Sequence, residues 1–170
     1  MKKLLSFSIM TILFLISVGC AKMPLRGDYV EEKSPPQMQA DAQSAAIIFF
    51  REWAFTGGGM SYFITEDTNN IGLLKAGSYF AYRATPGKHT YSAETEARSS
   101  VTLDIQPGQT YYIEGGIGMG FWAGRPQLSE VTKPVFDKVK SDLKYIRLAT
   151  PEEAAQFKEK EQKRDSGTTL

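Results

Sequence analysis

The feature that most constrains this chain is a series of short β-type segments, separated by turn residues, that runs from Ala45 to Ala149. The alternation of Val101, Leu103 and Ile105 with polar residues is typical of a half-buried strand. Residues 46–53 form a nearly continuous apolar run, which indicates a central buried strand. About 105 residues of this kind suffice for one sandwich-sized domain. We therefore predict a mostly β fold: a single antiparallel β-sandwich with one short helix and a helical C-terminal tail.

The predicted strands are bounded by turn signals such as Ala76-Gly77, Pro86-Gly87 and Pro107-Gly108. They cover 46–53, 61–66, 71–75, 78–83, 88–96, 101–106, 110–114, 127–131 and 143–148, with a short helix over 133–142. The strands on either side of Pro107-Gly108 are predicted to form a hairpin, and Asn69-Asn70 a turn. Because strands do not alternate with long helical patterns, a parallel sheet is not expected.

The first 19 residues have the organisation of an export signal, with Lys2 and Lys3 ahead of an apolar core over 4–18. That core is too short for a membrane span, which takes about 20 apolar residues. It ends in Ser17-Val18-Gly19-Cys20, which resembles the lipobox of bacterial lipoproteins. The resemblance implies cleavage before Cys20, acylation of Cys20 and, with Ala21 next in the chain, sorting to the outer membrane. Cleavage by signal peptidase I is the alternative.

The composition agrees with an exported, lipid-anchored protein. Cys20 is the only cysteine, so no internal disulfide forms and the fold depends on its hydrophobic core. Loss of Lys2 and Lys3 leaves 18 of the 20 basic residues against 19 acidic ones, a formal charge of −1. Such a balance argues against nucleic acid or an anionic membrane surface as the partner.

Four regions are expected. Residues 1–19 are the signal peptide, 20–44 a lipidated tether, 45–149 the β-sandwich domain, and 150–170 a charged helical or disordered tail that Pro151 begins. The tether prediction depends on Pro24, Gly27, Pro35 and Pro36, which break helices, and implies that the domain is lifted off the membrane. Packing of this segment as an edge strand is the alternative.

Three motifs within the domain resemble a known family. Phe49 to Arg51 end the first strand, Pro86-Gly87-Lys88-His89 forms a turn, and 107–112 (PGQTYY) forms another before a strand. Together they are similar to the small bacterial lipoproteins of the domain of unknown function DUF2846, over roughly 46–148. The same type of turn recurs in PEGA-type surface modules, which are small β-sandwiches. The resemblance implies a β-sandwich on a lipid tether and assigns no activity.

Catalytic, metal and cofactor chemistry find little support in the residues. His89 is the only histidine, and we expect a structural role in which its ring satisfies a turn carbonyl near Pro86-Gly87. Glutamates and aspartates show no metal-loop spacing, so no metal site is predicted. The glycine stretches 57–59 and 115–120 lack the strand-to-helix context of a phosphate loop. We expect no cofactor. Each stretch is read as a flexible loop, or as a strand that a large ring approaches closely.

Aromatic residues beside the two glycine stretches make the better candidate site. The candidate partner-binding residues are Trp53, Phe55, Tyr62, Phe121, Trp122 and Arg125. Aromatic side chains and arginine on loops are typical of protein and glycan contacts. We predict that the loops 57–59 and 115–125 lie at one end of the sandwich and form a binding face.

These observations predict a non-enzymatic envelope interaction module on the periplasmic face of the outer membrane. Its expected partners are the membrane, through the lipid on Cys20, and an envelope protein or glycan. A carbohydrate or peptidoglycan ligand is the first alternative. The second is a hydrolase that uses a carboxylate pair such as Glu114 with Glu96 or Asp104, although nothing in the sequence indicates the raised pKa that such a pair needs.

Overall fold

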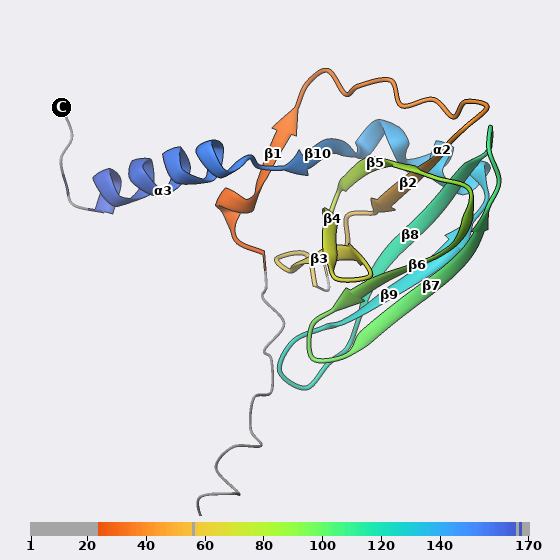
Figure 1. The fold of residues 1–170 in the computed structure, drawn as a ribbon. Coiled ribbons are helices and arrows are strands. Elements are labelled where there is room, and N and C mark those ends of the chain that lie inside the picture. The colour runs from red at the N-terminus through yellow and green to blue at the C-terminus, as the bar shows by residue number, and fades with distance from the viewer. Residues whose placement is uncertain (1–23, 56, 166, 168–170) are drawn as a thin grey trace, which may run out of the picture.

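The computed structural model describes residues 24–55, 57–165 and 167; the predicted signal peptide and the lipidation of Cys20 lie outside these residues. Figure 1 shows two sheets, one short helix against the domain and one helix that projects from it. The elements are η1 (Arg26–Asp28), β1 (Tyr29–Glu32), β2 (Ala45–Arg51), β3 (Ser61–Glu66), β4 (Asn69–Lys75), β5 (Ser78–Ala84), β6 (Gly87–Glu94), β7 (Arg98–Ile105), β8 (Thr110–Gly118), β9 (Arg125–Val131), α2 (Lys133–Val139), η2 (Lys140–Asp142), β10 (Lys144–Leu148) and α3 (Pro151–Asp165). No helix among the described residues is long and apolar enough to cross a membrane.

Two sheets face each other and form the sandwich. One has six strands in the order β1-β10-β5-β2-β8-β9, and the other has four in the order β4-β3-β6-β7. The prediction of a mostly β sandwich with one short helix and a helical tail is confirmed. Two strand pairs, β2 with β8 and β10 with β5, are parallel, whereas the other pairs are antiparallel. In both parallel pairs the two strands are separated along the chain by strands of the four-stranded sheet.

The predicted hairpin at Pro107-Gly108 is wrong. β7 pairs with β6 in the four-stranded sheet, while β8 pairs with β2 and β9 in the other. The turn therefore carries the chain from one sheet to the other, and the Gly108 N–H donates to the carbonyl of Ser44, which directly precedes β2. A proline-glycine pair marks a reversal of the chain but does not specify which strands pair across it.

The predicted turn at Asn69-Asn70 is displaced by two residues. Asn69 and Asn70 belong to β4, and the reversal falls on Asp67-Thr68 instead. Asp67 has φ +53°, a left-handed conformation that aspartate tolerates better than most residues. The reversal therefore needs no glycine.

Residues 24–44 are not an extended tether. β1 pairs with β10 in antiparallel register, and the carbonyl of Asp28 accepts a hydrogen bond from Ala149. Ion pairs hold this edge strand in place, since Glu31 binds both Lys75 and Lys144. The edge-strand alternative is therefore correct for 29–32. Of the prolines that suggested a tether, Pro35 and Pro36 lie in the connection that follows β1, whereas Pro24 lies before η1.

The core lies between the sheets and is dominated by stacked rings. Phe49 of β2 stacks on Phe80 with ring centroids 4.9 Å apart and lies edge to face with Tyr91 of the facing sheet at 5.3 Å. All three side chains are buried. On the outer face of the six-stranded sheet, Phe136 of α2 covers Phe50 at 5.2 Å. The apolar run of β2 is therefore buried on both faces, which explains why it does not alternate.

The glycine stretch that begins at Gly115 is part of β8 up to Gly118. A Cβ at Gly115 would overlap the hydroxyl of Tyr62 and lie 2.6 Å from a methyl group of Leu74. Of the two readings of this stretch, a strand that a large ring approaches closely is the correct one for these residues. The loop begins only at Met119.

Candidate functional site

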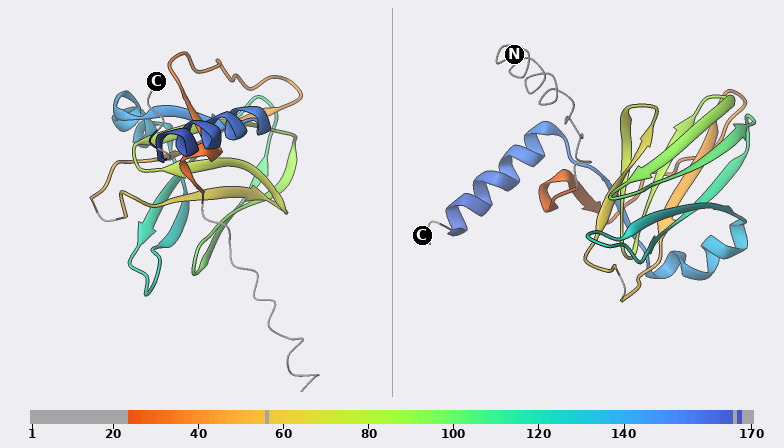
Figure 2. Two further views of the ribbon diagram at one scale, coloured as in Figure 1. Left: turned by 90° about the vertical axis from the view of Figure 1, so that its left-hand side faces the viewer. Right: turned by 90° about the horizontal axis from the view of Figure 1, so that it is seen from below.

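Connections from both sheets meet at one end of the sandwich. They are the β2–β3 loop (52–55 and 57–60), the β4–β5 turn (76–77), the β6–β7 turn (95–97) and the β8–β9 loop (119–124). Gly124 donates its N–H to Met60 Sδ at 3.3 Å, and Thr95 donates its hydroxyl to the Gly124 carbonyl at 2.6 Å. In the right-hand view of Figure 2 the two long loops, β2–β3 in gold and β8–β9 in teal, lie close together. We call this region the aromatic end.

Exposed apolar side chains gather at this end. The large hydrophobic side chains that are exposed, among the residues the structure describes, are Leu25, Trp53, Phe55, Met119, Phe121 and Trp122. Trp122 is 88% exposed and Phe55 90%. Five of the six lie in the two long loops, and Leu25 lies where the chain enters the domain. The placement of Trp53, Phe55, Phe121 and Trp122 at one end agrees with the prediction of a shared face.

Tyr62 does not belong to this surface. Its ring is fully buried in the core, and its hydroxyl donates to the carbonyl of Gly116 at 3.2 Å. Burial raises the pKa of the Tyr62 hydroxyl well above its usual value, because the anion would lose its hydration. The expectation that Tyr62 contacts a partner is therefore wrong. On β3, the residues that alternate with Ser61 and Phe63 point into the sandwich.

Glu96 holds the β8–β9 loop in shape. Its carboxylate accepts the backbone N–H groups of Phe121, Trp122 and Ala123 at 2.7 to 2.9 Å, and Nε of Arg125 at 3.1 Å. The Ala123, Trp122 and Phe121 N–H groups and Arg125 together hold the pKa of Glu96 at about 2. The rings of Phe121 and Trp122 meet edge to face at 4.8 Å. One carboxylate thus fixes the backbone that presents both rings.

Arg51 holds the β2–β3 loop in a similar way. This arginine ends β2 and is only 2% exposed. Its guanidinium donates to the carbonyls of Gly57 at 2.7 Å and Met60 at 2.8 Å, and it lies over the Tyr62 ring at 5.7 Å. A Cβ at Gly57 would lie 2.8 Å from Ile117 of β8, so the bases of the two loops are in contact. The aromatic end is therefore a preformed surface.

The attachment of the loop to Glu96 predicts a simple pH dependence. The pKa of Glu96 is lowered from 4.5 to about 2, so the attachment is complete above about pH 4.5 and is lost as the pH falls through about 2. Glu96→Gln should weaken it at every pH, because a neutral amide is a weaker acceptor than a carboxylate and has one acceptor oxygen in place of two. We expect amide hydrogen exchange at Phe121, Trp122 and Ala123 to rise at least about tenfold, measured by NMR at pH 6.

The matched control is Glu94→Gln. Glu94 lies two residues earlier, and its carboxylate pairs with the exposed side chain of Arg98. This change should leave exchange in the 121–123 segment unaltered. Equal exchange in the wild type and Glu96→Gln would show that the loop does not depend on this carboxylate.

His89 serves a different structural role from the one expected. Its Nδ1 lies 2.6 Å from Oε1 of Glu66, and no turn carbonyl near Pro86-Gly87 is involved in this contact. Tyr82 of the facing sheet donates its hydroxyl to the other oxygen of Glu66 at 2.6 Å. Burial and the Glu66 carboxylate raise the pKa of Tyr82 to about 12. Glu66 thus links a histidine and a tyrosine across the two layers.

The carboxylates considered for hydrolysis do not form a pair. Asp104 points outward from the four-stranded sheet, between buried Leu103 and Ile105. Glu114 lies in register with Phe50 on the outer face of the other sheet, where burial and nearby Glu52 raise its pKa. The two are therefore on opposite outer faces of the sandwich.

Glu96 is also unsuited to act as a general acid, because its pKa is lowered. No group of three histidine, cysteine or acidic side chains able to hold a metal is found among the described residues.

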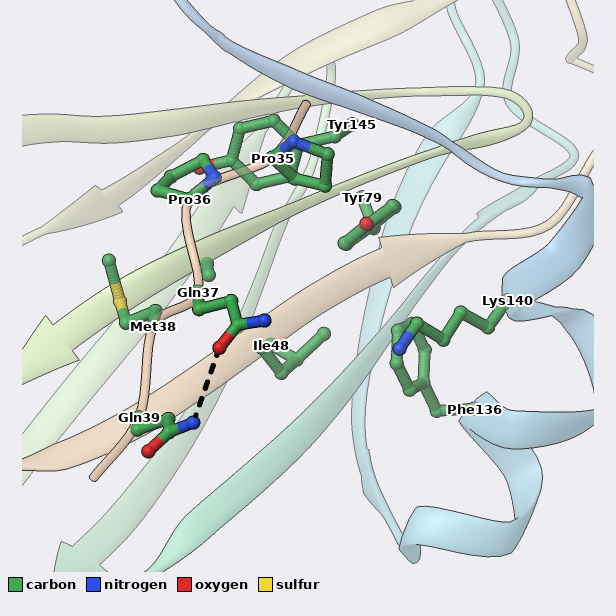
Figure 3. A pocket seen from close by; sticks show the side chains of 11 residues that line it. Pro35, Pro36, Gln37, Met38, Gln39, Ile48, Tyr79, Phe136, Lys140 and Tyr145 are labelled. Atoms are coloured by element: carbon green, nitrogen blue, oxygen red, sulfur yellow. Dashed lines mark hydrogen bonds between the residues drawn. The ribbon is translucent and has the colours of Figure 1, made fainter. Parts of the chain in front are cut away.

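A shallow groove crosses the outer face of the six-stranded sheet, and Figure 3 shows its lining. Tyr79 and Tyr145 form its floor, Lys140 and Phe136 bound one side, and residues 35–39 lie over the other. The lining holds no carboxylate, histidine or thiol. The groove therefore offers no acid–base pair, and one of its walls is the connection between β1 and β2. The aromatic end remains the better candidate.

Comparison with known proteins gives no match to a family model, to a curated protein or to a solved structure.

Proposed function

We propose that this protein is a lipoprotein anchored through Cys20 to the periplasmic face of the bacterial outer membrane, and that it acts without catalysis as an envelope interaction module. The observation that carries the proposal is the concentration of exposed large apolar side chains at the aromatic end. Contiguous exposed apolar patches mark sites that bind proteins, membranes or ligands. Here the backbone of the two loops is held in place by Glu96 and Arg51, which lowers the entropy that the loops lose when a partner binds.

The N-terminal sequence supplies the second support. A basic start, an apolar core and the lipobox-like Ser17-Val18-Gly19-Cys20 precede the domain directly. The motifs shared with DUF2846 fall on the end of β2 and on the starts of β6 and β8. We include membership of that family in the proposal. A lipid anchor confines the domain near the membrane, so a weak binding surface is sufficient.

The chemistry of the aromatic end favours an apolar partner over a glycan. A sugar site needs polar groups beside the rings to bind hydroxyl groups. The charged groups that contact the β8–β9 loop are Glu96 of the β6–β7 turn and Arg125 at the start of β9. They are engaged with each other, and Glu96 also accepts three backbone N–H groups. The Phe121 and Trp122 rings are therefore presented beside charged groups that are already paired with each other, and the exposed carboxylate of Glu52 is in the β2–β3 loop.

Two measurements test the proposal. Mass spectrometry of the mature protein should find acyl groups on Cys20, and Cys20→Ser should abolish them. In cells, a diazirine side chain that reacts with any C–H bond replaces Trp122. As control, it replaces Lys88, which lies near the start of β6 at the opposite end of the sandwich. We expect an adduct from position 122 alone. An unacylated chain refutes the anchor, and absence of any adduct at 122 refutes the binding surface.

A further inference from the structure

The chain enters the folded domain at the aromatic end. The carbonyl of Pro24, the first described residue, lies 3.5 Å from the hydroxyl of Ser61, which donates to it. Ser61 is the first residue of β3 and directly follows the β2–β3 loop. Figure 2 shows the described chain beginning on the side where both long loops lie. Leu25, the next residue, is 65% exposed and lines a hollow with Phe157 of α3.

The lipid site is only four residues away. A fully extended chain spans at most about 14 Å between Cys20 and Pro24. Residues 26–44, which a tether would need for reach, are instead held on the domain by β1 and by Asp41, whose carboxylate pairs with Arg83. An acylated Cys20 therefore keeps the domain against the bilayer. The end that faces the bilayer is the end where Pro24 lies.

The side chains at this end suit a lipid surface. Tryptophan is enriched at membrane interfaces, and phenylalanine, methionine and leucine favour the apolar layer below. Two carboxylates beside the β8–β9 loop are neutralised within the protein, since Glu96 pairs with Arg125 and Glu94 with Arg98, whereas Glu52 of the β2–β3 loop is exposed. Such pairs lower the cost of bringing the loops to the membrane. The near-neutral charge of the chain fits contact through apolar side chains.

We propose that the aromatic end is a second membrane contact: the exposed side chains of the two long loops and of Leu25 enter the interfacial layer of the bilayer that holds the Cys20 lipid. This inference rests on the proposed lipid anchor and names the partner of the same surface. The anchor and the aromatic end together fix the orientation of the domain. The opposite end, with the β5–β6 turn and the β7–β8 connection, is then presented to the periplasm.

The chain carries its own probes for this contact. Trp53 and Trp122 are its two tryptophans, and both lie at the aromatic end. The acylated full-length protein is reconstituted in vesicles of phosphatidylethanolamine and phosphatidylglycerol whose acyl chains are plain or brominated. Trp53→Phe and Trp122→Phe each leave one tryptophan. Bromine on the acyl chains quenches only tryptophan rings that reach the acyl region. The tryptophan emission of each variant should therefore be about twofold lower in brominated than in plain vesicles, if its ring lies at the depth typical of interfacial side chains.

The matched control places a tryptophan at the far end, as Trp53→Phe/Trp122→Phe/Lys88→Trp. Its emission should be the same in plain and brominated vesicles. If the loop tryptophans also show no quenching while the acylated protein floats with the vesicles, the second contact is refuted and the anchor stands. If Cys20 carries no lipid, anchor and contact fall together. A discrete protein adduct from position 122 in cells would assign the surface to a protein and overturn the inference.

Discussion

Replacing Phe49 by alanine is expected to lower the free energy of unfolding by about 3–5 kcal/mol, one of the two largest effects anticipated for a single substitution in this protein. Phe49 is completely buried between the sheets. It stacks on Phe80 at 4.9 Å and lies edge to face with Tyr91 at 5.3 Å, so its removal leaves a cavity walled by two rigid rings. Urea denaturation followed by far-ultraviolet circular dichroism measures the change.

The matched control for this prediction is Phe55→Ala. Phe55 is 90% exposed in the β2–β3 loop, so its removal should change stability by less than about 0.5 kcal/mol. The same variant should weaken the membrane contact, which separates the folding role of one phenylalanine from the binding role of the other. Similar losses of stability in both variants would mean that the β2–β3 loop is packed on the core and that Phe55 is not presented to a partner.

The strands were largely predictable because each is short and ends at a turn signal. β3 is predicted residue for residue, and β5 and β10 within one residue of their ends. Strand pairing was not predictable, because the inward and outward alternation of Val101, Leu103 and Ile105 is the same whichever sheet holds β7. The Pro107-Gly108 reversal fits both a hairpin and a crossing between sheets, and only the packing of the whole core decides between them.

The aromatic end was predictable in part. Glycine next to aromatic residues indicated loops with exposed rings, and this holds for Trp53 and Trp122. It fails for Tyr62, because the same pattern arises where a glycine in a strand makes room for a buried ring. The residues that shape the loops were missed. Arg51 is 6 residues from the Gly57 carbonyl it binds, and Glu96 is 26 from Trp122, so nothing local in the sequence marks either as an anchor.

The segment before the domain shows the same limit of local patterns. Pro35 and Pro36 do exclude regular structure where they stand, and the prediction of a tether followed from them. The pairing of 29–32 with β10 depends instead on partners more than 100 residues away, such as Arg147 with Glu32 and Lys144 with Glu31. This long-range pairing shortens the link to Cys20 and so changes the orientation that a lipid anchor would impose.

Arg51→Met is expected to lower the free energy of unfolding by about 2 kcal/mol and to release the β2–β3 loop. The guanidinium makes two hydrogen bonds to loop carbonyls, and each bond to a charged group contributes about 1.5–3 kcal/mol. Burial also removes water from the charged guanidinium, which lowers the pKa of Arg51. This loss of hydration offsets part of the free energy that the two hydrogen bonds contribute. Methionine keeps the apolar stem of the side chain but cannot donate. Because the buried charge is also removed, the loss is smaller than the sum of two bonds.

Arg98→Met is the control, because Arg98 is exposed and its pair with Glu94 contributes about 0.3–0.5 kcal/mol. The informative comparison is between stability and bromolipid quenching of Trp53. If the guanidinium acts only on folding, the folded fraction of Arg51→Met should be quenched as strongly as the wild type. If it also presents the loop, quenching of Trp53 should fall while quenching of Trp122, which Glu96 holds in place, is retained. The second result is expected, because Arg51 binds carbonyls of the Trp53 loop alone.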